Sequence, residues 1–133
     1  MPPEQRDSAD PKDWLRRARS NLALARQGTL LGDEVLYEDL CFDAQQAAEK
    51  AIKALLIHRG AAYPKTHDIA HLLTLVQRSG LEVPEEIRQS SRLTRYAGIS
   101  RYGGLPEALA EEDYARIVRL AERVYRWAES LIV

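Results

Sequence analysis

The sequence has little cysteine, no long apolar run and no excess of charge of one sign. Its single cysteine, Cys41, cannot form a disulfide within the chain, so we expect the reducing cytoplasm. No apolar run approaches the roughly 20 residues that span a bilayer, and we expect no membrane association. With 19 Lys and Arg against 20 Asp and Glu, the net charge of −1 gives no global attraction to nucleic acid. Nucleic-acid binding would therefore need a local basic patch.

The chain length and its first residues indicate a simple organisation. We expect the 133 residues to form one domain, 1–133. Residues 1–11 are polar and lack an apolar core, which predicts a flexible extension rather than a secretory signal. Cys41 lies within an apolar helical pattern, and we expect it to be a small core residue rather than a nucleophile.

Strand patterns are also missing, because apolar and polar residues do not alternate over any convincing stretch. Apolar residues instead recur at three- and four-residue steps. This pattern predicts an all-α, up-and-down helical bundle of about five helices, with two long antiparallel helices. The expected helices are Lys12–Gln27, Glu34–Arg59 capped by Asp33, a third capped by Thr66 and closed by Gly80, a fourth that starts after Pro84 and weakens near Ala97–Gly98, and Pro106–Ile132.

The stretch from Tyr63 to Leu73 holds two of the three histidines. His67 and His71 are four residues apart, as in helices that bind zinc, but the acid between them is Asp68 and no third ligand follows. We therefore predict no metal site and no cofactor.

Lys65 and Thr66 precede this helix and offer a different chemistry. The first turn of a helix presents unpaired N–H groups and a partial positive charge, so a lysine beside it favours a bound phosphate or carboxylate. The alternative is that Asp68 already fills the first turn as the local acid. The sequence leaves both open.

The most basic segment runs from Arg88 to Gly104 and contains no acidic residue. Helical spacing predicts that Arg88, Arg92 and Arg95 share one face. The pairs Arg95-Tyr96 and Arg101-Tyr102 combine a phosphate-binding side chain with an aromatic ring, a pattern typical of nucleotide or nucleic-acid binding. The alternative is a solvated basic face that pairs with the acidic run that follows, Glu107, Glu111, Glu112 and Asp113.

Residues 42–73, FDAQQAAEKAIKALLIHRGAAYPKTHDIAHLL, resemble the HEPN domain family, and the later Arg101-Tyr102-Gly103 resembles its arginine–tyrosine turn before the last helix. The resemblance extends over about residues 12–131. It implies a helical bundle that forms a homodimer. It also implies a minimal nucleotidyltransferase partner, the two proteins acting as a toxin–antitoxin pair.

The resemblance also extends to a wider superfamily in which many members are metal-independent RNases, with four to six residues between an arginine and a histidine. Seven residues separate Arg59 from His67, and no histidine follows His71, so the motif is absent here. We predict a non-catalytic subunit that binds a nucleotide or a partner. An RNase that uses His67 with a displaced arginine and a purely structural dimerisation module stay open as alternatives. The candidate ligand-binding residues are Lys65, His67, Arg95, Tyr96, Arg101 and Tyr102.

Overall fold

A computed structural model describes residues 9–28, 32, 34–98 and 108–132 of the chain. These residues form helices and connections without a strand, which confirms the predicted all-α bundle. The elements are α1 (Pro11–Ala25), α2 (Tyr37–His58), α3 (Ile69–Arg78), α4 (Glu85–Arg88), the 3-10 helix η2 (Gln89–Tyr96) and α5 (Glu111–Leu131). In the part of the chain covered by these ranges, no helix is long and apolar enough to cross a membrane.

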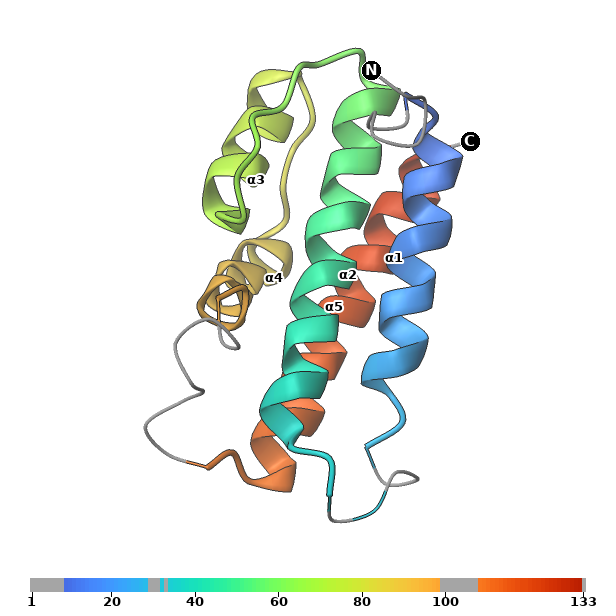
Figure 1. The fold of residues 1–133 in the computed structure, drawn as a ribbon. Helices are drawn as coiled ribbons and strands as arrows, with labels where there is room; N and C mark the ends of the chain where they lie inside the picture. The colour runs from blue at the N-terminus through green and yellow to red at the C-terminus, as the bar shows by residue number, and fades with distance from the viewer. Residues whose placement is uncertain (1–8, 29–31, 33, 99–107, 133) are drawn as a thin grey trace.

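Three long helices stand side by side, and the shorter ones cover another side of α2 (Figure 1). The chain descends through α1 and returns through α2, so these two helices are antiparallel. Helices α3, α4 and η2 follow beside α2, and α5 starts at the end of the bundle where α2 begins (Figure 1). As a result α5 runs parallel to α2 and antiparallel to α1.

Helix α2 is the centre of the bundle and packs against α1, α3, η2 and α5. Its middle is rich in alanines with no exposed surface, and these small side chains let the neighbouring helices approach closely. The predicted apolar stripe from Leu40 to Leu55 is buried, whereas Leu36 at its start is 55% exposed. Cys41 is a buried core residue, as predicted. Burial, with the nearby Asp113 and Glu38 carboxylates, raises the pKa of its thiol to about 12, so it stays protonated near neutral pH.

Two predicted helix starts are wrong by a few residues. Helix α2 begins at Tyr37 instead of Glu34, with Leu36 in the capping position and no side-chain cap; the predicted cap, Asp33, lies outside the described residues. Helix α3 is capped by Asp68, whose carboxylate accepts a hydrogen bond from the His71 N–H, and not by Thr66. The Thr66 hydroxyl instead accepts from the Asp68 N–H at 3.1 Å. Thr66 therefore shapes the turn that positions the cap.

The fourth predicted helix has the expected extent but is mostly 3-10, and the last helix starts later than expected. The fourth starts after Pro84 as predicted, but after one α-helical turn it continues as the 3-10 helix η2 up to Tyr96. The last helix begins at Glu111, because residues 108–110 are not helical, and the predicted start at Pro106 lies outside the described residues. The Asp113 carboxylate accepts a hydrogen bond from the Ala110 N–H at this helix start.

Tyr114 joins the end of α1 to the start of α5. Its hydroxyl donates to the Ala25 carbonyl and accepts from the Gly28 N–H at 3.2 Å. A Cβ at Gly28 would lie 2.9 Å from the Tyr114 ring, so this position needs glycine for close approach rather than for a left-handed backbone. Burial raises the pKa of the Tyr114 phenol, which keeps the proton that the carbonyl accepts.

Candidate functional site

The predicted site residues lie in two separate pockets, while Arg101 and Tyr102 lie outside the described residues. Arg95 and Tyr96 line one pocket, and Lys65 and His67 line the other. We call the first the arginine pocket; it is lined by Ser91, Arg92, Arg95, Tyr96, Arg116 and Ile117. We call the second the lysine pocket; it is lined by Trp14, Lys53, Tyr63, Lys65, Thr66 and His67.

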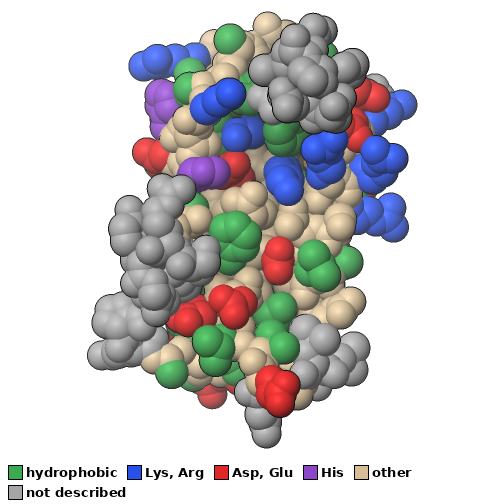
Figure 2. All heavy atoms as spheres, in the orientation of Figure 1, with side chains coloured by type: hydrophobic (Ala, Val, Ile, Leu, Met, Phe, Trp, Pro, Cys, Tyr) green, Lys and Arg blue, Asp and Glu red, His purple; other side chains and the backbone are tan. Residues whose placement is uncertain are grey.

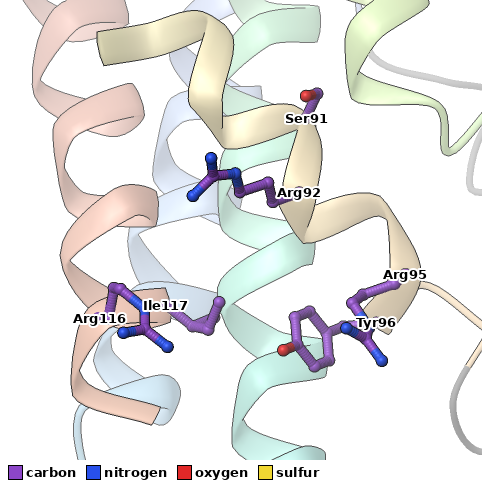
Figure 3. A pocket seen from close by; sticks show the side chains of 6 residues that line it. All are labelled: Ser91, Arg92, Arg95, Tyr96, Arg116 and Ile117. Carbon is purple, nitrogen blue, oxygen red and sulfur yellow. The ribbon is translucent and has the colours of Figure 1, made fainter. Parts of the chain in front are cut away.

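The arginine pocket is a cavity of about 560 Å³ between η2 and α5. Figure 3 shows the guanidinium groups of Arg92 and Arg116 and the hydroxyl of Tyr96 turned toward the same space. Arg95 lies beside the Tyr96 ring, with its Cζ atom 5.7 Å from the ring centroid. Two elements that are distant in the sequence thus present several donors to one cavity.

The arginines of η2 do not all share the face that helical spacing predicted. Residues three apart align in a 3-10 helix, which places Arg92 and Arg95 at the same pocket. Arg88 ends the preceding α-helical turn, and its Nη2 atom donates instead to the Gln77 side-chain oxygen of α3 at 2.7 Å. Arg88 is therefore not part of the pocket.

One carboxylate reduces the positive charge of the arginine pocket. Asp113 pairs with Arg116, with 2.6 Å between Oδ1 and Nη2. Both partners are on α5 and are well exposed, so this pair has little effect on stability. Within the described ranges, neither Arg92 nor Arg95 makes an ion pair with an acid. The guanidinium groups of these two arginines, which form the η2 side of the pocket, are thus available to pair with an anionic ligand.

Tyr96 presents its hydroxyl, rather than the face of its ring, to the arginine pocket. The side chain is only 3% exposed, so its ring is not accessible for stacking on a base, as the sequence had suggested. Burial raises the pKa of the phenol, which therefore stays protonated and can donate at neutral pH. The arginine pocket is suited to an anion and lacks an aromatic platform at Tyr96.

The lysine pocket is a cavity of about 340 Å³ between the start of α1, the last turns of α2 and the connection to α3. The Lys53 Nζ atom lies 5.9 Å from the Trp14 ring centroid and 5.7 Å from that of Tyr63. The two rings meet edge to face at 6.1 Å. These distances are within the range of cation–π attraction, so the rings help to hold a buried ammonium group.

A buried carboxylate, Glu49, lies behind the lysine pocket and accepts three hydrogen bonds. Gln45 Nε2 lies 2.9 Å and His67 Nδ1 lies 2.7 Å from Oε1, and Lys53 Nζ lies 2.9 Å from Oε2. Burial alone raises the pKa of Glu49, but the hydrogen bonds from Lys53, Gln45 and His67 outweigh it, so that the pKa is lowered. Glu49 is therefore ionised near neutral pH, and His67 must present an N–H to it.

The two histidines do not form the zinc pair that their spacing suggested. The His67 ring faces Glu49, whereas the His71 backbone N–H caps α3 through Asp68. Among the described residues, no three His, Cys, Asp or Glu side chains gather in a way that could hold a metal ion.

Lysine and arginine side chains are concentrated at one end of the face shown in Figure 2. They lie in its upper half, where α1 begins and α2 ends, while acidic side chains occur in both halves. The lysine pocket belongs to this end of the bundle, because Trp14 lies in the first turns of α1 and Lys53 in the last turns of α2.

Three comparisons place the chain among known proteins. The model of the HEPN domain family matches residues 11–131. The chain belongs to the HEPN family. The crystal structure of ST0689, an archaeal HEPN homologue, is 30% identical, with a TM-score of 0.73 over 93% of this chain and 98% of that one. The crystal structure of TT1696 from Thermus thermophilus is also 30% identical, with a TM-score of 0.75 over 91% and 97% of the two chains. No curated protein has a matching sequence.

Sequence reasoning assigned no site role to Glu49, Lys53 or Arg116. The first two carried a signal, since they are two charged residues four apart in the alanine-rich middle of α2. Arg116 carried none. It is one of several arginines on α5, and only the packing of η2 against α5 distinguishes it.

Glu49 makes the stability of the protein sensitive to acid. Its pKa is lowered from the usual 4.5, so the unfolded chain binds a proton at higher pH than the folded one. The free energy of unfolding therefore falls as pH decreases from 4.5 through the folded-state pKa. Glu49→Gln leaves Lys53 without its counter-charge and is expected to lose about 3 kcal/mol at neutral pH. Urea denaturation over a pH series measures both effects.

The matched control for this experiment is Glu86→Gln, at an exposed glutamate of α4. This variant should keep the wild-type stability and its dependence on pH. Glu49→Gln should lose stability less steeply than wild type in the acid range, because one titrating carboxylate has been removed. Parallel curves for wild type and Glu49→Gln would show that Glu49 contributes nothing to the acid sensitivity.

Proposed function

We propose that this HEPN protein is a non-catalytic subunit whose arginine pocket binds the phosphate groups of a nucleotide. The supporting observation is that Arg92, Arg95 and Arg116 line one cavity from two different elements. Guanidinium groups bind phosphate oxygens through two parallel hydrogen bonds, and each such bond to a charged group is stronger than a neutral one. The Tyr96 hydroxyl adds a neutral donor to the same space.

The shape of the arginine pocket fits this ligand class. Its volume of about 560 Å³ is within the range of small-molecule sites. Ile117 supplies an apolar surface beside the charged groups. Because the Tyr96 ring is buried, we expect the affinity to come mainly from phosphate contacts, so it should depend strongly on salt and weakly on the base.

Titration calorimetry with ATP tests the pocket. The Arg92→Ala, Arg95→Ala double variant is expected to bind ATP at least about tenfold more weakly, because two charge-assisted contacts are removed. Arg78→Ala is the matched control, since Arg78 is an exposed arginine of α3 that does not line the pocket. Equal affinity of the double variant and the control would refute the assignment. If the double variant also loses affinity for AMP and for inorganic phosphate by a similar factor, phosphate is the group that the pocket recognises.

We further propose that the protein functions with a minimal nucleotidyltransferase, as a toxin–antitoxin type pair, and forms a homodimer. The membership in the HEPN family supports this, and so does an apolar surface near the start of α2. There Val35, Leu36, Tyr37 and Leu109 line a cavity of about 320 Å³, and Leu36 is 55% exposed. A large exposed leucine beside an apolar cavity is typical of a protein-binding surface.

Co-expression with a nucleotidyltransferase encoded beside this gene tests the partnership. We expect the two proteins to purify together, and Leu36→Asp to reduce the yield of the complex because a charge would be buried against the partner. Leu24→Asp is the control, at a second exposed leucine among the described residues, which does not line this cavity. A complex that is unaffected by Leu36→Asp would place the interface elsewhere, and failure to co-purify would argue against the partnership.

One contact favours a second candidate function, that of a metal-independent RNase. The Glu49 carboxylate holds His67 Nδ1, which leaves Nε2 as the basic nitrogen of an exposed side chain, as in general-base histidines. Arg95 lines the arginine pocket and not the pocket of His67, so within one chain these two residues are not brought together. The other candidate arginine, Arg101, lies outside the described residues, and we rank this function second.

The RNase hypothesis predicts cleavage of RNA in the presence of EDTA. His67→Ala should abolish this cleavage, and His71→Ala, at the other exposed histidine of the segment, should not. The measurement is the loss of a labelled RNA between about pH 6 and 8, the range in which histidine general bases work. RNA that stays intact over this range excludes the hypothesis, as does equal activity of wild type and His67→Ala.

A further inference from the structure

The lysine pocket contains a buried charged pair that the fold alone does not require. Lys53 is 8% exposed and Glu49 is 3% exposed. Removing two charges from water costs several kcal/mol per ion, and apolar residues of similar size often serve the fold equally well. Along α2 the pair lies beside buried Ala48, Ile52 and Ala54, and beside Gln45, which donates to Glu49. A buried ion pair at the wall of a cavity therefore needs a reason beyond packing.

The pocket has a positive charge. Its lining includes Lys53, Lys65 and His67, and none of the six described lining residues is acidic. Glu49 lies behind Lys53 and neutralises one ammonium group. The nearby Asp68 uses its carboxylate to cap α3. The exposed ammonium of Lys65 is thus not balanced by an acid of the lining, so the cavity favours an anion.

The polar groups of the pocket have hydrogen atoms available for a ligand. Lys53 has three N–H donors and gives one to Glu49 Oε2. The Thr66 oxygen accepts from the Asp68 N–H, which leaves the hydroxyl hydrogen to donate elsewhere. His67, by contrast, gives the N–H of its neutral ring at Nδ1 to Glu49, so Nε2, on the opposite side of a side chain that is 61% exposed, accepts hydrogen bonds rather than donating them. These groups surround the same cavity from α2 and from the connection to α3.

From this arrangement we propose that the lysine pocket is a second ligand site, which takes the phosphate or carboxylate group of a small molecule between Lys53, Lys65 and Thr66. Glu49 acts as a positioning residue, because it holds Lys53 and His67 at the cavity wall. Trp14 and Tyr63 form the apolar wall, which suits a ligand whose anionic group is attached to an apolar body. The site is independent of the arginine pocket and does not rest on the function proposed above.

Trp14 provides a direct reporter for this site. The chain has two tryptophans, and Trp127 is on α5, so the Trp127→Phe variant leaves Trp14 as the only tryptophan. Titration of this variant with phenyl phosphate and with benzoate, at constant ionic strength, should give a saturable change of Trp14 fluorescence with at least one of them. A response to phenyl phosphate alone identifies a phosphate site, and a response to benzoate alone identifies a carboxylate site. No saturable response to either ligand overturns the proposal.

Substitutions in the same background test the residues. Lys65→Ala and Thr66→Val, at surface positions that leave the buried pair intact, should each weaken binding about three- to tenfold. Lys12→Ala is the matched control, at an exposed lysine of α1 outside the pocket, and should bind as the parent does. The combined Glu49→Gln, Lys53→Met variant removes the pair without leaving a lone charge, and should bind more than about tenfold more weakly while its circular dichroism stays helical. Unchanged binding in all three pocket variants overturns the proposal.

Measuring the arginine-pocket variant in the Trp14 fluorescence assay distinguishes the two pockets. The Arg92→Ala, Arg95→Ala double variant should keep the Trp14 response, because those residues line only the arginine pocket. Loss of the response in that variant would assign the signal to the arginine pocket and refute the second site. ATP binding that fails while the Trp14 response persists would refute the proposed nucleotide pocket alone.

Discussion

The enclosure of α2 by its neighbours is the constraint on which the rest of the structure depends. Helices α1, α3, α5 and η2 all pack against it, and its alanines have no exposed surface. Small side chains allow this crowding, because each neighbouring helix can approach the backbone of α2 closely. A polar group in the middle of such a helix cannot reach water and must find its partners within the protein. Gln45, Glu49 and Lys53 satisfy this requirement by bonding to one another and to His67.

The same enclosure separates the two pockets. One pocket is bounded by η2 and α5, and the other by α1 and the connection that follows α2. Arg92 and Arg95 of the basic segment therefore face one cavity, and Lys65 and His67 of the histidine segment face the other. The two proposed anion sites therefore occupy separate cavities and would not compete for one volume. Their different surroundings, arginines in one and aromatic rings in the other, would suit them to different ligands.

Helical periodicity was sufficient to predict the bundle, because the core residues of α2 and α5 follow three- and four-residue steps that only a helix places on one face. The helix starts were less predictable. Thr66 and Asp68 are both good capping residues, and the choice between them depends on a turn that Thr66 itself helps to form. The 3-10 geometry of η2 moved Arg88 away from Arg92 and Arg95, and a helical wheel cannot show this. Arg116 joins those arginines only through tertiary packing, which no local pattern encodes.

The hydroxyl of Tyr114 has a consequence for the order of events during synthesis. It bonds to the Ala25 carbonyl, 89 residues earlier in the chain. This hydrogen bond at the last turn of α1 can form only after Tyr114 has been synthesised. At the usual rate of translation this delay is on the order of ten seconds. During that time α1 and α2 can already pair, but the side of α2 that α5 will cover stays open to solvent and to other nascent chains. The arrival of α5 closes this surface and completes the end of the first helix in one step.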